Sequence, residues 1–214
     1  MKFYMTPGSC STAIHIILEE MEEIFEAHIV NLPAGDQFKP EYLAINPKAN
    51  IPALVRPDGT VLTEVAAIAF WLGRARKRGQ FWPANLEDET RALETMIFVT
   101  SSLHGHGFAR IFAPGQFSAD SQAHATIEAQ GRALVQKGFG IVNQTLEGRK
   151  WVGGDYGVAD AVLFYVEFWA DKIGLALPAN LLAHYRAMLA RPAVSQVLRE
   201  EGYAPDKLGQ RDRV

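Results

Sequence analysis

Residues 51–68 read IPALVRPDGTVLTEVAAI, and this stretch decides how the first part of the chain folds. Two short apolar runs, 53–56 and 60–63, flank Pro57-Asp58-Gly59. An Asp-Gly pair between two apolar runs is typical of a turn that joins antiparallel strands. A helix is expected next, because apolar side chains recur there at the spacing of one buried helix face: Val65, Ile68, Ala69 and Leu72.

The residues before this stretch predict two more strands and another helix. Residues 2–5 are apolar and partly aromatic, and Pro7-Gly8 stops them, which predicts a strand followed by a turn. Residues 27–32 predict a second strand. Between the two, from Ser11 onward, the period becomes that of a helix with one buried face: Ile14, Ile17, Leu18 and Met21. Residues 1–78 are therefore expected to form a small α/β domain.

The strand signals disappear after Gly79. Helical patterns cover 87–112, 121–147, 158–173 and 179–190, and the third of these segments is the clearest because its apolar period persists over four turns. We expect a connector at 79–85, an all-helical domain at 86–203 and a polar, loosely ordered tail at 204–214.

The charge of the chain excludes some classes of partner. A formal net charge of -3 over 214 residues creates no large field of one sign. Neither nucleic acid nor an anionic membrane surface is therefore expected as a partner. The one marked basic cluster, from Arg74 to Arg78, is interpreted as a solvated helix end.

The cysteine count and the apolar runs indicate the compartment. Cys10 is the only cysteine, so an intrachain disulfide and a multi-cysteine zinc site are both excluded, and no metal is expected. The first residues lack the apolar core of a signal peptide, and no apolar run is long enough to span a bilayer. These features predict a soluble protein of a reducing compartment, most simply the cytoplasm.

Cys10 lies in Pro7-Gly8-Ser9-Cys10-Ser11, between the first predicted strand and the first predicted helix. A helix N-terminus exposes free N–H groups and the positive end of a dipole, which can lower the pKa of a thiol and hold a thiolate. Ser9 and Ser11 offer hydroxyl groups at the same point. The alternative is a free, partly buried cysteine between two serines that act as helix caps.

Two further features could bind a ligand. A cis Ile51-Pro52 bond would turn the Ile51 backbone toward whatever lies over the first helix, where its N–H and C=O could pair with an extended peptide ligand. The alternative is an ordinary loop proline. Glu64 precedes a helix and could receive an ammonium group while the free N–H groups of the helix receive a carboxylate. Its simpler role is to complement the helix dipole.

His104 and His106 lie in a segment with two glycines, Gly105 and Gly107. Histidines two positions apart on a helix point to different faces and make a poor chelating pair. The glycines indicate that the helix is bent or interrupted, at a cost of roughly 1 kcal/mol each relative to alanine. That cost suggests close packing or a ligand nearby.

Together these features resemble the cytosolic glutathione S-transferases, and most closely the bacterial beta class. The matching motifs span almost the whole chain in the order of the family: Pro7-Gly8-Ser9-Cys10-Ser11, Asn46-Pro47-Lys48, Ile51-Pro52-Ala53-Leu54, Leu62-Thr63-Glu64 with Ala67-Ile68, Leu103-His104, Trp151-Val152-Gly153-Gly154, Val158-Ala159-Asp160-Ala161 and Arg191-Pro192-Ala193-Val194. The resemblance implies a thioredoxin-like first domain with a cis proline at Pro52 and an all-helical second domain.

The resemblance also implies that glutathione binds as the co-substrate. Ile51 would bind its cysteinyl backbone, with Asn50 and Pro52 beside it, and Glu64 with the amide of Val65 would bind its γ-glutamyl end.

Cys10 would lie beside the glutathione sulfur, and Ser9, Ser11 or backbone N–H groups would hold the thiolate. The histidine of the family's long helix maps onto His104, with His106 as a rival that would contact glutathione.

The activity implied is conjugation of the glutathione thiolate to a small hydrophobic electrophile. The electrophile would lie against Phe108, Phe112 and Trp169 in the helical domain. The family also implies a homodimer. Two alternatives stay open at this point: a glutathione-dependent disulfide reductase that uses Cys10 as its nucleophile, and a non-catalytic module that uses the same fold to bind other proteins.

Four positions depart from the pattern of the family. Val65 stands in place of the usual serine or glycine, and Ile97 in place of an asparagine. Met5 replaces a tyrosine, and Gly157 replaces the serine or threonine that normally caps the helix of Asp160. We expect these four changes to affect the turnover rate more than the binding of glutathione.

Overall fold

A four-stranded sheet in the order β2–β1–β3–β4 forms the first part of the chain in the computed structural model, which describes residues 1–210 apart from the side chain of Arg78. Strand β1 pairs in parallel with β2 and antiparallel with β3, and β3 pairs antiparallel with β4. The parallel pair needs a crossover, which α1 supplies. The bounds are β1 Lys2–Met5, α1 Thr12–Glu20, β2 Glu26–Ile29, α2 Pro40–Leu43, β3 Ala53–Val55, β4 Val61–Thr63 and α3 Val65–Ala75.

The predicted hairpin is confirmed. β3 and β4 pair from Ala53 opposite Thr63 to Val55 opposite Val61. Gly59 has a φ of +82°, a left-handed conformation that glycine adopts without steric cost. The Asp58 carboxylate accepts a hydrogen bond from the backbone N–H of Thr60 at 2.9 Å. The turn chemistry of the Asp-Gly pair therefore sets the register of both strands.

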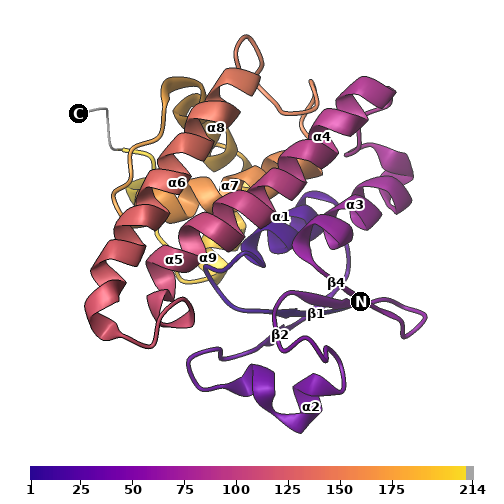
Figure 1. Cartoon of the computed structure of the whole chain (residues 1–214). Helices are drawn as coiled ribbons and strands as arrows, with labels where there is room; N and C mark the ends of the chain where they lie inside the picture. The colour runs from indigo at the N-terminus through magenta and orange to yellow at the C-terminus, as the bar shows by residue number, and fades with distance from the viewer. Residues whose placement is uncertain (211–214) are drawn as a thin grey trace.

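The remaining helices form the second part of the molecule. Figure 1 shows α1 and α3 between the sheet and these helices, with α2 on the far side of the sheet. Within residues 1–210, no helix is both long enough and apolar enough to cross a bilayer. The bounds are α4 Leu86–Phe98, a π-helix Val99–Phe108, α5 Ala109–Phe112, α6 His124–Thr145, α7 Val158–Lys172, α8 Ala179–Leu189 and α9 Pro192–Glu200.

The predicted helix at 87–112 is interrupted, as its glycines suggest. Its middle, Val99–Phe108, is a π-helix between α4 and α5. A Cβ atom on Gly107 would lie 2.6 Å from a methyl group of Val135 on α6, and one on Gly131 would lie 2.8 Å from the Gly107 carbonyl. Glycine is thus required where these two helices cross, which confirms the expected close packing.

The end of the chain has more structure than its local sequence pattern indicates. Helix α9 was not predicted, because its apolar signal is confined to Val194, Val197 and Leu198, about one turn. The tail is also not loose up to residue 210. The backbone N–H of Gly209 donates to Asp171 at 2.8 Å, and its carbonyl accepts from Arg186 at 3.0 Å. These partners are distant in sequence, so no local pattern announces them. Residues 211–214 of the predicted tail lie outside the described residues.

The basic cluster at the end of α3 is paired with acids. Arg74 contacts Glu89, Arg76 contacts Glu23, and Lys77 lies 3.4 Å from Glu22. The Arg78 side chain lies outside the described part. These pairs agree with the interpretation of a helix end that is not a phosphate site.

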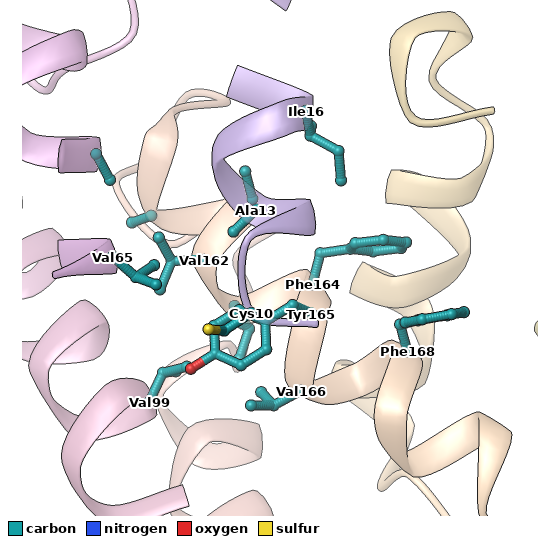
Figure 2. Packing of buried hydrophobic residues seen from close by; sticks show 14 of the residues in the cluster. Cys10, Ala13, Ile16, Val65, Val99, Val162, Phe164, Tyr165, Val166 and Phe168 are labelled. Carbon is teal, nitrogen blue, oxygen red and sulfur yellow. The ribbon is translucent and has the colours of Figure 1, made fainter. Parts of the chain in front are cut away.

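Helix α7 is buried on all sides. Every residue from Val158 to Ala170 is buried, although the sequence pattern marks mainly one apolar face. Figure 2 shows Val162 and Phe164 of this helix on the side of Ala13 and Ile16 of α1, and all four side chains belong to one buried cluster. The helices that contact α7 include α1, α3, α4 and α8.

Burial of α7 encloses a charged cluster. Nδ1 of His184 lies 2.8 Å from Glu167, and Nε2 lies 3.1 Å from Asp160. The Asp160 carboxylate also accepts hydrogen bonds from the backbone N–H groups of Val152 and Gly157, both at 2.8 Å. Gly157 is the residue before α7, so Asp160 caps the N-terminus of its own helix.

The electrostatics of this cluster favour a protonated histidine. Burial by itself lowers the pKa of His184, but the charge of Glu167, the hydrogen bonds to Asp160 and Glu167, and the charge of Asp160 outweigh it and raise the pKa to about 10. Burial raises the pKa of Glu167. The folded state therefore binds more protons than the unfolded state in this range. The stability contributed by His184 is full below its unfolded pKa of roughly 6.5 and is lost as pH rises through about 10.

His184→Gln should lower the free energy of unfolding at pH 6 by about 3 kcal/mol, because two buried carboxyl groups lose their cationic partner. Thermal melts from pH 6 to pH 10 should show a steeper loss of stability in the parent than in the variant. The exposed His106 provides the control His106→Gln, which should match the parent. Parallel profiles for parent and His184→Gln would contradict a protonated His184.

Candidate active site

A cavity of about 550 Å³ lies between the sheet domain and the helical part. Loops and helix ends of the first domain form one wall, and the π-helix, α7 and the loop after α5 form the other. Its lining residues are Ser9, Cys10, Leu32, Gln37, Phe38, Ala49, Asn50, Ile51, Glu64, Val65, Thr100, His104, Gly105, Gln116 and Trp169. A second cavity, of about 570 Å³, lies at the connector and contains none of the predicted site residues.

The structure brings together most of the residues that the sequence singles out. The cavity is lined by eight of them: Ser9, Cys10, Asn50, Ile51, Glu64, Val65, His104 and Trp169. The others lie outside its lining. Pro52 is buried behind Ile51, Ser11 and Phe108 are fully buried, His106 is exposed, and Phe112 borders the aromatic wall.

The two serines close a loop and do not cap the helix. The Ser11 hydroxyl donates to the Thr6 carbonyl at 3.0 Å and accepts from the Thr6 N–H at 3.1 Å. The Ser9 hydroxyl donates to the same carbonyl at 2.7 Å and lies 2.6 Å from the Ser11 hydroxyl. No side chain caps α1. Only Ser9 of this pair therefore faces the cavity.

Cys10 is a free, buried thiol. It is 6% exposed, and its Sγ donates to the Ile51 carbonyl at 3.6 Å. Burial raises the pKa of Cys10 to about 12. Of the two interpretations of Cys10, this favours the buried cysteine: the loss of hydration outweighs the nearby N–H groups, so the pKa of the thiol is not lowered. At neutral pH the group beside the cavity is a weak hydrogen-bond donor.

The loop before β3 holds its backbone toward the cavity. The Ile51-Pro52 peptide bond is cis, as predicted. The Asn50 carbonyl accepts hydrogen bonds from the Tyr42 hydroxyl at 2.6 Å and the Asn46 amide at 2.7 Å. These bonds fasten the loop from behind, so the backbone of Ile51 remains available to a ligand.

Glu64 lies directly before α3 in an uncommon backbone conformation, with φ 70° and ψ 123°. Positive φ in a residue other than glycine is strained and clusters at functional sites. The Glu64 carboxylate lies 2.6 Å from Lys48 Nζ, and both side chains are about half exposed. Such an exposed pair contributes little stability. A ligand ammonium group could displace Lys48 at little cost, while the first N–H groups of α3 receive a carboxylate.

The opposite wall is aromatic. The His104 ring packs edge-on against Trp169, with 4.9 Å between ring centroids, and Phe112 packs against Trp169 at 5.3 Å. Phe108 stacks behind Phe112 at 5.6 Å. Burial lowers the pKa of His104 to about 4, so the ring is neutral at pH 7. This wall suits an apolar substrate.

Several lining residues were not predicted. Gln37 and Phe38 come from a short 3-10 helix after β2, Asp36–Phe38. The side-chain Oε1 of Gln37 is a buried acceptor with no hydrogen-bond partner among residues 1–210. Thr100 and Gln116 come from the helical part. None of these residues belongs to a motif, and only the packing of the two parts brings them to one cavity.

Glu201, from the end of the chain, anchors the loop that carries Ser9 and Cys10. Its carboxylate accepts hydrogen bonds from the Gly8 N–H at 2.7 Å and the Thr12 hydroxyl at 2.6 Å, and lies 2.9 Å from His15 Nδ1. On the other side, the Trp169 indole donates to the Gly8 carbonyl at 2.8 Å. No sequence signal in the last helix points to this role.

Comparison with known proteins agrees with this geometry. A family model described as the glutathione S-transferase N-terminal domain matches residues 8–75. Glutathione S-transferase GstA of Escherichia coli O157:H7 is 33% identical over 211 residues, which cover 94% of this chain and 99% of that protein.

Two solved structures are similar over nearly the whole chain. A glutathione transferase homologue from Sulfitobacter, with bound glutathione, is 26% identical, with a TM-score of 0.86 over 95% of this chain and 98% of that one. A beta class glutathione S-transferase from Sphingomonas chungbukensis is 27% identical, with a TM-score of 0.81 over 95% and 100% of the two chains.

Glu201→Gln should lower the free energy of unfolding by about 2 kcal/mol, because charge-assisted bonds to buried donors are lost. Its neighbour provides a matched control: the Glu200 side chain is 46% exposed and lies 3.3 Å from Nε2 of His15. Glu200 also accepts a bond from Gln196 on the same helix face. Glu200→Gln should change stability by less than about 0.5 kcal/mol. Urea unfolding of the three proteins checks this, and equal losses in both variants would contradict a special role for Glu201.

Proposed function

Because the chain belongs to the glutathione S-transferase family, we propose that it joins the thiolate of glutathione to small hydrophobic electrophiles. The observation that carries this proposal is the composition of the cavity. One wall presents backbone groups and a carboxylate suited to a peptide, and the other presents Trp169 and its aromatic neighbours. Glutathione is the co-substrate, and the site needs no other cofactor for this reaction.

Glutathione would lie along the first wall. Its γ-glutamyl ammonium would bind Glu64 in place of Lys48, and the adjacent carboxylate would face the amide of Val65 at the start of α3. The backbone of Ile51, beside Asn50, would pair with the cysteinyl unit as a neighbouring strand would. The glutathione sulfur would then lie near Cys10.

The nucleophile is the thiolate of glutathione. Its proton passes to solvent, and the thiolate attacks the electrophile and displaces a leaving group or adds to a double bond. When glutathione binds, the Ser9 hydroxyl would turn from the Thr6 carbonyl and the Cys10 thiol from the Ile51 carbonyl, so that each donates a hydrogen bond that stabilises the thiolate. Ser11 supports the loop through its bonds to Thr6. Because the pKa of Cys10 is raised, disulfide reduction by a Cys10 thiolate is not favoured.

The electrophile would lie against His104, Phe112 and Trp169, with Phe108 behind them. Phe112 is 50% exposed, which leaves it accessible to a small apolar molecule. Conjugation of this kind removes reactive electrophiles, so a detoxifying role follows. The exposed His106 lies outside the lining, so His104 is the histidine that would face the reaction.

We also propose the cytoplasm as the compartment. The only cysteine is the free thiol of Cys10, and the proposed co-substrate belongs to the system that keeps cytosolic thiols reduced.

A homodimer is proposed on the exposed apolar side chains of α3 and α4. Phe70 on α3 is 43% exposed, and Leu93 and Ile97, one turn apart on α4, are 39% and 50% exposed. Figure 1 shows these two helices side by side, α3 from the first domain and α4 from the second. A second copy would bury this surface by packing its first domain against the helices of its partner.

Light scattering at micromolar concentration should give about twice the chain mass of 23.6 kDa. Ile97→Glu should shift the mass toward that of the monomer, because it places a charge in an apolar interface. Leu134→Glu, at a side chain of α6 that is 43% exposed, is the control and should leave the mass unchanged. A monomeric parent would contradict the proposal.

Glu64→Gln should weaken glutathione binding by roughly tenfold to a hundredfold, because the ligand ammonium loses a charged partner. Calorimetric titration of parent and variant checks this. Glu147→Gln, at an exposed acid just after α6, is the matched control and should bind as the parent does.

The same proteins and Cys10→Ala should be assayed for conjugation of glutathione to a model aryl halide. Cys10→Ala should retain conjugation at a reduced rate, because Cys10 only assists the glutathione thiolate. Complete loss of conjugation with unchanged glutathione affinity would show that Cys10 itself is essential. A parent that neither binds glutathione nor conjugates it would remove the proposed function.

A further inference from the structure

Tyr165 of α7 is fully buried, and its hydroxyl has one hydrogen-bond partner among residues 1–210. That partner is Nδ1 of His104, at 3.3 Å. Figure 2 shows the hydroxyl directed from α7 toward Val99, on the π-helix that also carries His104. The tyrosine ring packs edge-on against Trp169, 4.9 Å away. A buried group thus reaches a residue of the cavity wall from behind.

The direction of this hydrogen bond follows from burial. A buried hydroxyl proton needs an acceptor, because an unsatisfied donor away from water is costly. Within the described part of the chain, His104 Nδ1 is the acceptor in reach of Tyr165. Burial raises the pKa of Tyr165 well above its ordinary value, so the hydroxyl keeps its proton. Nδ1 of His104 therefore accepts, and the proton of the neutral imidazole is on Nε2.

The other ring nitrogen is the one that can serve the cavity, which His104 lines. The two nitrogens of an imidazole face away from each other, so Nε2 points away from Tyr165. His104 lines the cavity beside Trp169 and Thr100, and no described residue forms a hydrogen bond with its Nε2. The aromatic wall therefore presents one N–H donor. With Nδ1 occupied and the pKa of the ring lowered by burial, His104 is poorly suited to act as a base.

We propose that Tyr165 is a positioning residue that holds His104 as an Nε2–H donor, and that the enzyme therefore favours electrophiles that gather negative charge on an oxygen atom. The substrate class is the α,β-unsaturated carbonyl compounds. This inference rests on the proposed transferase function and adds to it the class of electrophile.

The reaction balances without a further reagent. The glutathione thiolate forms a bond to the β-carbon, the electron pair of the C=C bond moves to form the enolate C=C bond, and the pair of the C=O bond moves to oxygen. His104 Nε2–H would donate to this oxygen as its charge grows. A proton from solvent then reaches the α-carbon and restores the carbonyl, replacing the proton that the thiol released. In an alkyl halide the charge leaves with the halide, so this donor stabilises the reaction less.

The tautomer can be tested without glutathione. In protein labelled with ¹⁵N-histidine, nitrogen chemical shifts distinguish a protonated from an unprotonated ring nitrogen, and His104→Gln assigns the signals. The parent should show His104 protonated at Nε2 only. Tyr165→Phe should introduce the Nδ1–H tautomer or move its Nδ1 signal. Tyr185→Phe is the matched control, since this tyrosine is also fully buried but donates to Asp171 at 3.0 Å. A parent protonated at Nδ1, or a His104 signal unaffected by Tyr165→Phe, would overturn the assignment.

The substrate class is tested by comparing benzylideneacetone, an unsaturated ketone, with benzyl chloride, which has no acceptor oxygen. Tyr165→Phe should lower kcat for the ketone by roughly threefold to tenfold, the equivalent of one ordinary hydrogen bond, with little change in KM. Its rate with benzyl chloride should stay near that of the parent, and Tyr185→Phe should retain both rates.

Equal losses with both electrophiles would reduce Tyr165 to a structural role and overturn the proposal. A parent that conjugates neither electrophile and does not bind glutathione would contradict the proposed transferase function, and the proposed substrate class with it. The nitrogen spectra would still decide the tautomer.

Discussion

Helix α7 is buried from Val158 to Ala170, and this constraint organises the rest of the molecule. A helix buried on all sides can carry polar side chains only if each finds a partner inside the protein. The helix meets this demand in several directions. Asp160 and Glu167 hold His184 of α8, Tyr165 reaches His104 of the π-helix, and Trp169 reaches the Gly8 carbonyl of the first domain.

These bonds connect the buried helix to both walls of the cavity. The loop with Ser9 and Cys10 is held between Trp169 and Glu201. The Trp169 indole N–H donates to the carbonyl of Gly8, and the Glu201 carboxylate accepts from its backbone N–H. Gly8 itself has a φ of +73°, and a Cβ there would lie 1.9 Å from the Tyr203 hydroxyl oxygen, so only glycine fits. The site is therefore built on a loop that the second domain, including the end of the chain, holds in place.

Cys10 illustrates how burial can outweigh a local effect. Its place before α1 suggests a lowered pKa, since free N–H groups and the helix dipole favour a thiolate. In the folded protein the thiol is 6% exposed, and the loss of hydration raises the pKa to about 12. The dipole argument needs only the adjacent helix, whereas burial depends on residues from the whole chain.

The sequence by itself determined the elements whose signals are local. The Asp58-Gly59 turn and the apolar period from Val65 were predicted because each depends on neighbours within a few positions. Glu64 was found for the same reason, at the start of a recognisable helix. The cis Pro52 was implied by the resemblance to the family, whereas its local sequence also fits an ordinary loop proline.

Only the tertiary structure decided which of two similar residues lines the cavity: Ser9 faces it while Ser11 closes a loop, and His104 lines its wall while His106 is exposed. It also supplied Gln37, Glu201 and Tyr165, which have no local signal. Burial and hydrogen-bond partners come from segments far apart in the chain, and a local period carries no information about what will pack against it.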